Sequence, residues 1–96
     1  MARFLIECSH AADELTCARV VKLFLASGSH LLTHADWGCM DGVHRAWIIV
    51  DVPDKSAAMA IVPPALRSTA TIVGLNQFSL EQIDAILKKH SSASSQ

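Results

Sequence analysis

The stretch Gly28–Val52, GSHLLTHADWGCMDGVHRAWIIVDV, decides the fold because it contains the strongest hairpin signal in the chain. Asp41-Gly42 lies between two runs rich in aromatic and β-branched residues, and an Asp-Gly pair tolerates the positive φ angles of a two-residue type I′ turn. Counting outward from that turn predicts the strand partners, among them Trp37 with Ala46, Asp36 with Trp47 and His34 with Ile49.

Side chains alternate along a strand, so the predicted hairpin has two different faces. One face carries most of the groups capable of chemistry: His30, His34, Asp36, Arg45, Trp47 and Asp51. The other face is largely apolar and also carries Cys39 and His44, which would be direct partners beside the turn. A histidine there could lower the pKa of the thiol, but the position near the sheet end favours a packed thiol and a surface histidine.

Size and composition restrict the class of protein. Ninety-six residues, 51% of them hydrophobic and 18% charged, fit one domain with a modest core. A net charge of -1 with scattered basic residues argues against nucleic acid as the partner. The apolar runs are too short for a secretory signal or a membrane span. Three cysteines without CxxC spacing favour reduced thiols, so we expect a cytoplasmic protein that binds no membrane.

The remaining elements follow from periodicity and capping residues. Residues 2–8 alternate as a strand, and a helix follows with Ser9 or Asp13 as its cap and Gly28 at its end. Asp54 caps a helix that Pro63-Pro64 ends, and a strand runs from Ala70 to about Phe78. Ser79 and Gln82 form a capping box that begins a final helix. We expect a single domain over residues 1–90 and a disordered serine-rich tail over residues 91–96.

This order of elements predicts an α+β fold of the ferredoxin-like type, βαββαβ with a C-terminal helix. Right-handed crossovers would place both main helices on one face of a four-stranded antiparallel sheet. We expect the covered face to bear the more apolar set: Phe4, Ile6, Cys8, Ala35, Trp37, Ile48, Val50, Val73 and Leu75. The opposite face has no element of its own to cover it.

At this point the chain resembles the dimeric α+β barrel proteins, and by its length the muconolactone isomerase-like members most. The resemblance covers residues 2 to about 78 and depends on element order, domain size and the passage IIVDVPD at residues 48–54. It implies a homodimer in which two sheets pack face to face around a small-molecule pocket, and it implies isomerase chemistry only weakly. No active-site motif matches, so no catalytic residue is carried over.

The residues themselves suggest a site on the uncovered face. His34 is the candidate base and Asp36 the group that orients its ring, while Arg45 could stabilise a carboxylate or enolate. Further candidate ligand-binding residues are Glu7, Trp47 and Asn76. The alternative is structural: Asp36 and Arg45 form a cross-strand ion pair, His34 bonds across a dimer interface, and Trp47 anchors that interface.

A metal site is the third possibility. Glu7, His30, His34 and Asp36 share the uncovered face and offer nitrogen and oxygen ligands. On a strand, however, His30 and His34 would be roughly 13 Å apart, so no metal ligand and no cofactor is predicted.

The sequence therefore favours a homodimer, or a higher oligomer, that binds an organic acid or related metabolite and acts as an isomerase-like acid-base enzyme. The competing hypothesis is a non-catalytic oligomerisation module. In either case an exposed apolar patch would drive self-association through the uncovered face: Leu5, Leu32, Trp47, Ile49 and Ile72.

Overall fold

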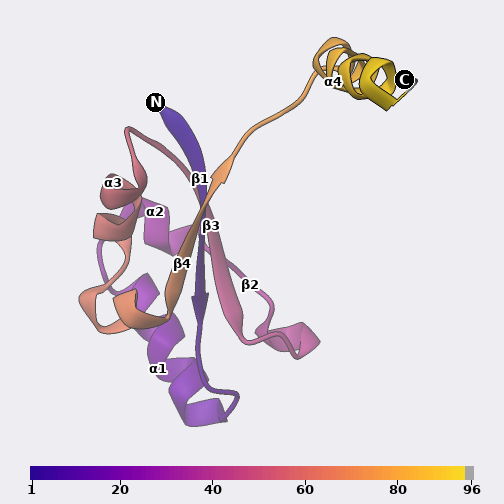
Figure 1. Ribbon diagram of the computed structural model, residues 1–96. Helices are drawn as coiled ribbons and strands as arrows, with labels where there is room; N and C mark the ends of the chain where they lie inside the picture. Colours follow the sequence, from indigo (N-terminus) through magenta and orange to yellow (C-terminus); the bar gives the residue numbers. More distant parts are fainter. Residues whose placement is uncertain (95–96) are drawn as a thin grey trace.

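The computed structural model describes residues 1–94 and the side-chain environments of residues 1–91. It is an α+β fold built on a four-stranded antiparallel sheet (Figure 1). The strands are β1 (Ala2–Ser9), β2 (Asp36–Trp37), β3 (Arg45–Val52) and β4 (Ala70–Leu75). Their order across the sheet is β2-β3-β1-β4, which is compatible with the ferredoxin-like pattern.

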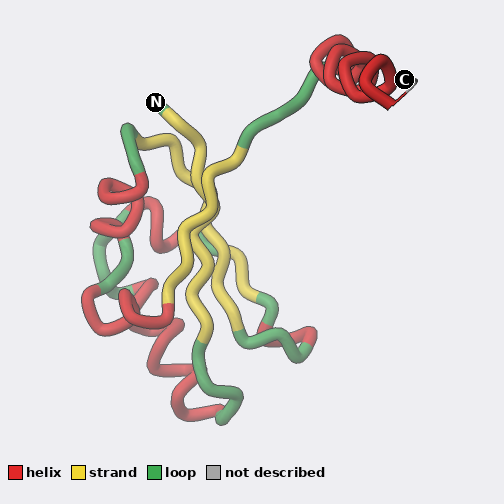
Figure 2. The backbone as a smooth tube through the Cα atoms, in the orientation of Figure 1, coloured by secondary structure: helices red, strands yellow, loops and turns green. Residues whose placement is uncertain are grey.

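Three helices cover one face of this sheet, and Figure 2 shows them together on one side of the strands. They are α1 (Glu14–Leu25), α2 (His30–Thr33) and α3 (Lys55–Ile61). Two 3₁₀ turns, η1 (Cys39–Asp41) and η2 (Pro64–Thr69), lie in the connections, and α4 (Leu80–Ser94) follows the last strand. In the described residues no helix is both long and apolar enough to cross a membrane.

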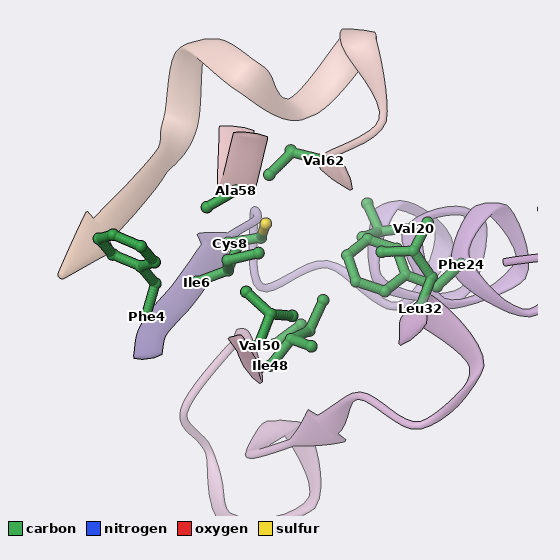
Figure 3. Close-up of a cluster of buried hydrophobic side chains, with 11 residues drawn as sticks. Phe4, Ile6, Cys8, Val20, Phe24, Leu32, Ile48, Val50, Ala58 and Val62 are labelled. Carbon is green, nitrogen blue, oxygen red and sulfur yellow. The ribbon is translucent and has the colours of Figure 1, made fainter. Parts of the chain in front are cut away.

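The core fills the space between the sheet and these helices (Figure 3). Alternate residues of β1 and β3 are buried, as the sequence pattern predicts: Phe4, Ile6, Cys8, Ala46, Ile48 and Val50. Phe24 from α1 is fully buried and meets the ring of Trp37 edge-on at 4.9 Å. The helix-covered face is therefore the apolar one on these strands.

The predicted faces of β4 are wrong. Ile72 pairs with Ile6 and Gly74 with Phe4, so Ile72 lies on the helix-covered side, while Val73 pairs with Leu5 on the other side. Every residue of β4 except Thr71 is apolar or glycine, so alternation could not indicate which face is buried; pairing with β1 determines it. We call the uncovered side the open face. It bears Arg3, Leu5, Glu7, Asp36, Arg45, Trp47, Ile49, Asp51, Thr71, Val73 and Leu75.

The central hairpin is correct in register but much shorter than predicted. Asp36 pairs with Trp47 and Trp37 with Ala46, as expected. Before Asp36 the chain is helical instead of extended, because Gly28 adopts a φ of 76° and the Ser29 hydroxyl accepts a hydrogen bond from the Leu32 N–H at 3.2 Å. This cap begins α2, so the predicted pairing of His34 with Ile49 does not form.

The turn of that hairpin also differs from the two-residue type. Residues Cys39–Asp41 form η1, and Gly42 follows with a φ of 79°. The Gly38 carbonyl accepts hydrogen bonds from the N–H groups of both Asp41 and Val43, at 2.9 Å each. The loop therefore spans Gly38 to His44 and places the side chains of Cys39 and His44 beside the end of β1.

The predicted helix caps are confirmed. Asp13 accepts a hydrogen bond from the Thr16 N–H and Asp54 one from the Ala57 N–H, both at 2.8 Å. At α4 the capping box closes in both directions: the Ser79 N–H donates to Gln82 Oε1 at 2.8 Å, and the Gln82 N–H donates to Ser79 Oγ at 3.1 Å. Side-chain oxygens at these positions thus define where the helices begin.

Helix α4 stands away from the sheet at the end of an extended segment (Figures 1 and 2). The radius of gyration is 18.3 Å, against about 12 Å for a compact chain of this length. The expected disorder from residue 91 onward is not what the structure shows as far as Ser94, because the helix continues to that residue. Serine can continue an established helix at modest cost. Residues 95 and 96 lie outside the described part.

Candidate functional site

Three open-face residues form a hydrogen-bonded group that joins the two central strands of the sheet, β1 and β3. Arg45 Nη1 donates to Glu7 Oε1 at 2.9 Å, and Trp47 Nε1 donates to Glu7 Oε2 at 3.1 Å. Glu7, and not Asp36, is therefore the ion-pair partner of Arg45, and the expected cross-strand pair of Asp36 with Arg45 is wrong. β1 lies next to β3 in the sheet, so the Glu7 carboxylate reaches both Arg45 and Trp47 of β3.

A hollow of about 330 Å³ lies beside this group, between α2 and the open face. It gathers two predicted catalytic residues, His34 and Asp36, together with Trp47. The rest of its lining is His30 and apolar side chains: Leu5, Leu31, Ile48 and Ile49. No ion pair or hydrogen bond joins the Asp36 side chain to residues 1–91, whose side chains the structure describes, so its carboxylate is available to a ligand.

The ring of His34 is oriented by its own helix. Its Nδ1 lies 2.7 Å from the His30 carbonyl oxygen, and because that oxygen can only accept, Nδ1 carries the proton. Nε2 is left as the atom that can take up a proton from a ligand. His34 is thus a C-terminal residue of a helical turn, not the mid-strand residue that we predicted.

The same turn brings His30 close to His34, with ring centroids 4.5 Å apart. The expected separation of roughly 13 Å between these histidines assumed that both lie on a strand. Residues four apart on a helix are instead neighbours. Both imidazoles therefore border the same hollow.

Asn76 lies elsewhere, immediately after the end of β4. It lines a second and shallower hollow of about 520 Å³ with the ion-paired side chains of Arg3 and Asp51, whose Nε and Oδ1 atoms are 3.5 Å apart. Asn76 thus does not join His34 and Asp36, although Ile49 borders both hollows. Of the six predicted site residues, His34, Asp36 and Trp47 line the first hollow. Glu7 and Arg45, which complete the hydrogen-bonded group with Trp47, lie beside it, and Asn76 lies apart.

A group of thiols and imidazoles lies at the C-terminal end of β1, the end opposite the hollow that Asn76 lines. We call this group, which the sequence did not connect, the thiol-imidazole cluster. Its members are His10, Cys17, Cys39 and His44, and one potential ligand atom from each lies within 4.8 Å of those of the others. All four side chains are half-buried. His10 Nε2 is 3.4 Å from Cys39 Sγ, and the two histidine rings meet edge-on with centroids 5.5 Å apart.

Burial shifts the pKa values of two residues in this cluster, His10 and Cys39. Desolvation, followed by the positive potential of His44, lowers the pKa of His10. Desolvation by burial, followed by the neighbouring Cys17 thiol, raises the pKa of Cys39. The Cys39 side chain is half-buried, in keeping with the favoured prediction of a packed thiol, whereas His44, predicted to be a surface histidine, is half-buried as well.

The four cluster residues come from separate places in the chain, which explains why the spacing did not reveal them. His10 follows β1, Cys17 lies in the first half of α1, and Cys39 and His44 flank the hairpin loop. Among the four, only Cys39 and His44 were predicted to be neighbours, as partners in the register of the hairpin. The hydrogen bond from the His10 N–H to the His44 carbonyl, 3.1 Å long, joins the two loops.

Comparison with known proteins adds no relationship: no family model, curated protein or solved structure matches this chain.

Proposed function

We propose that the protein is a homodimer of the dimeric α+β barrel type that binds a small organic acid between its open faces. The observation that supports this most is the hollow beside α2, where His34, Asp36 and Trp47 come together on the uncovered side of the sheet. A closed assembly would exclude water from that hollow and strengthen the electrostatic interactions inside it.

Exposed apolar surface supports the dimer. On the open face the side chain of Ile49 is 61% exposed, and on α4 that of Leu87 is also 61% exposed. The chain exposes 6826 Å², roughly 1,400 Å² more than the surface expected for a monomer of this mass. A standard interface covers about 800 Å² on each partner, so a second copy that covered part of this excess would suffice for a stable dimer.

We infer the ligand class from the side chains of the hollow, which include no lysine or arginine, so the two imidazoles are the groups that could contact an acid. Trp47 offers a flat apolar surface, and its indole N–H is already engaged by Glu7. His34 Nε2 can accept or return a proton, and the Asp36 carboxylate lines the same hollow. A small unsaturated or keto acid, from which one carbon loses a proton and another gains it, fits this arrangement as an isomerisation substrate.

A thermal-shift screen of carboxylate metabolites tests the proposal, because a ligand that binds only the native state raises its melting temperature. For a ligand so found, His34→Ala should weaken binding about tenfold or more, and Asp36→Asn, which keeps the shape and removes the charge, should weaken it less. His90→Ala, which removes a histidine from α4, is the control. Normal binding by both hollow variants would exclude the site.

The alternative function is assembly alone. In that case His34→Ala would weaken the dimer, as light scattering would show, and no screened carboxylate would raise the melting temperature. A protein that stays monomeric at micromolar concentration would contradict both hypotheses.

A further inference from the structure

We propose that His10, Cys17, Cys39 and His44 form a four-coordinate zinc site that holds the hairpin loop against α1 and the end of β1. The site is separate from the hollow on the open face, and no residue belongs to both.

The donor set has the composition of a tetrahedral zinc centre. Two thiolate sulfurs and two imidazole nitrogens are the ligands of the Cys₂His₂ class, with Zn–S distances of about 2.3 Å and Zn–N distances of about 2.0–2.1 Å. In a regular tetrahedron such bonds place the donors about 3.3–3.8 Å from one another. The contact of 3.4 Å between His10 Nε2 and Cys39 Sγ already falls in this range. The widest separation, 4.8 Å, requires only small side-chain rotations.

The protein leaves polar atoms of this cluster unsatisfied. The Nδ1 atoms of His10 and His44 are buried and have no hydrogen-bond partner in the described residues. A buried polar atom without a partner carries a desolvation cost, so native proteins seldom keep two in one place without a ligand or water. Ligation of His44 through Nδ1 would satisfy that atom, whereas ligation of His10 through Nε2, the nitrogen that faces Cys39, would leave the His10 Nδ1 atom to a bound water.

The surroundings favour a soft or borderline cation. The cluster contains no carboxylate, and the ring of Trp37 packs edge-on against His10 at 6.0 Å. Magnesium and calcium require oxygen ligands, whereas thiolates with imidazoles select zinc. Two thiolates also neutralise a divalent cation, so the completed centre would bear no net charge beside the apolar ring of Trp37.

Four protein ligands leave no open coordination position, which is the arrangement of a structural centre and not of a catalytic one. The ligands come from three segments: the end of β1, helix α1 and the hairpin loop. Regular structure holds this loop only weakly, because β2 has two residues and η1 is a single turn. Metal binding would thus order the loop from Gly38 to His44, and folding and metal affinity would be coupled.

Cobalt substitution tests the site on the full chain. We expect chelator-treated, reduced protein to bind one Co²⁺ per chain, with the intense visible bands of tetrahedral cobalt and a thiolate-to-cobalt charge-transfer band. Zn²⁺ should displace the cobalt stoichiometrically. Cys17→Ser and Cys39→Ser should each remove the charge-transfer intensity in part and lower the zinc affinity at least about 100-fold, measured against a chromophoric chelator.

The chain offers matched controls for these variants. Cys8→Ala removes the third thiol, which lies in the core outside the cluster, and His34→Ala removes an imidazole at the end of α2. Both should bind cobalt as the wild type does. Far-UV circular dichroism identifies any variant that fails to fold, and His10→Ala and His44→Ala then provide independent ligand removals.

Three outcomes of the cobalt experiments would overturn the proposal. They are a cobalt spectrum of octahedral type, an unchanged spectrum in folded Cys39→Ser protein, and no binding by fully reduced chain whose thiols have been counted. A Cys17–Cys39 disulfide that persists under reducing conditions would equally exclude the site.

Discussion

Gly38 is the residue on which the hairpin loop depends most directly. A Cβ atom at this position would lie 2.7 Å from the Val43 carbonyl oxygen and 2.8 Å from two ring atoms of Trp47. The backbone oxygen cannot move without breaking the loop, and Trp47 is held by its bond to Glu7. Only a residue without a side chain fits between them.

We therefore expect Gly38→Ala to lower the free energy of unfolding by about 1–3 kcal/mol, the usual cost of forcing atoms into a packed site. Chemical denaturation measures the change. Gly74→Ala is the matched control, because its Cβ would meet only ordinary contacts, 3.6 Å from a ring atom of Phe4. Equal stability of the two variants would show that the loop rearranges freely.

The stabilisation of α1 by its N-cap residue, Asp13, depends on pH. The hydrogen bonds from Thr16 lower the pKa of the Asp13 carboxyl below its ordinary value. The folded state thus binds this proton less tightly than the unfolded state. The contribution of the ionised cap is full above the unfolded pKa of about 3.9 and is lost as the pH falls through the lower folded value.

Asp13→Asn keeps a capping side chain but cannot titrate. We expect the stability difference between wild type and this variant to be constant above about pH 5 and to shift against the wild type as the pH falls toward 2. Urea denaturation at several pH values measures it. A difference that is the same at every pH would mean that the Asp13 carboxyl does not stabilise α1.

The sequence predicted these elements unequally, and the residues show why. Short-range signals were sufficient for the caps at Asp13, Asp54 and Ser79, because capping involves neighbours three residues apart. The same type of signal was overlooked at Ser29, where a strand was expected. The thiol-imidazole cluster could not be predicted from spacing, since tertiary folding brings its three segments together.

Helix α4 exposes apolar side chains that assembly would cover. Its side chains Leu80, Ile86 and Leu87 are exposed, and the helix stands off the sheet (Figure 1). An apolar stripe on a helix is stable in water only when something covers it. Because the protein is proposed to be a homodimer, a second copy is the expected cover.

Leu87→Glu should therefore dissociate the assembly with little effect on the fold of each chain, because Leu87 is exposed in the single copy. We expect the mass from light scattering to fall from that of a dimer toward 10.3 kDa, with an unchanged circular dichroism spectrum. Lys89→Glu, a neighbouring change of charge on the same helix, should leave the mass unaltered. Dissociation by both variants would indicate a general charge effect instead.

The brevity of β2 has a consequence for aggregation. It pairs with β3 only at Trp47 and Ala46, so the outer edge of residues 48–52 has no strand partner in the described chain. Unpaired edges of this kind recruit strands from other molecules and begin fibrils. Here α2 packs against β3 where the predicted strand would have continued. The turn that Ser29 initiates thus shields the adjoining backbone from intermolecular pairing.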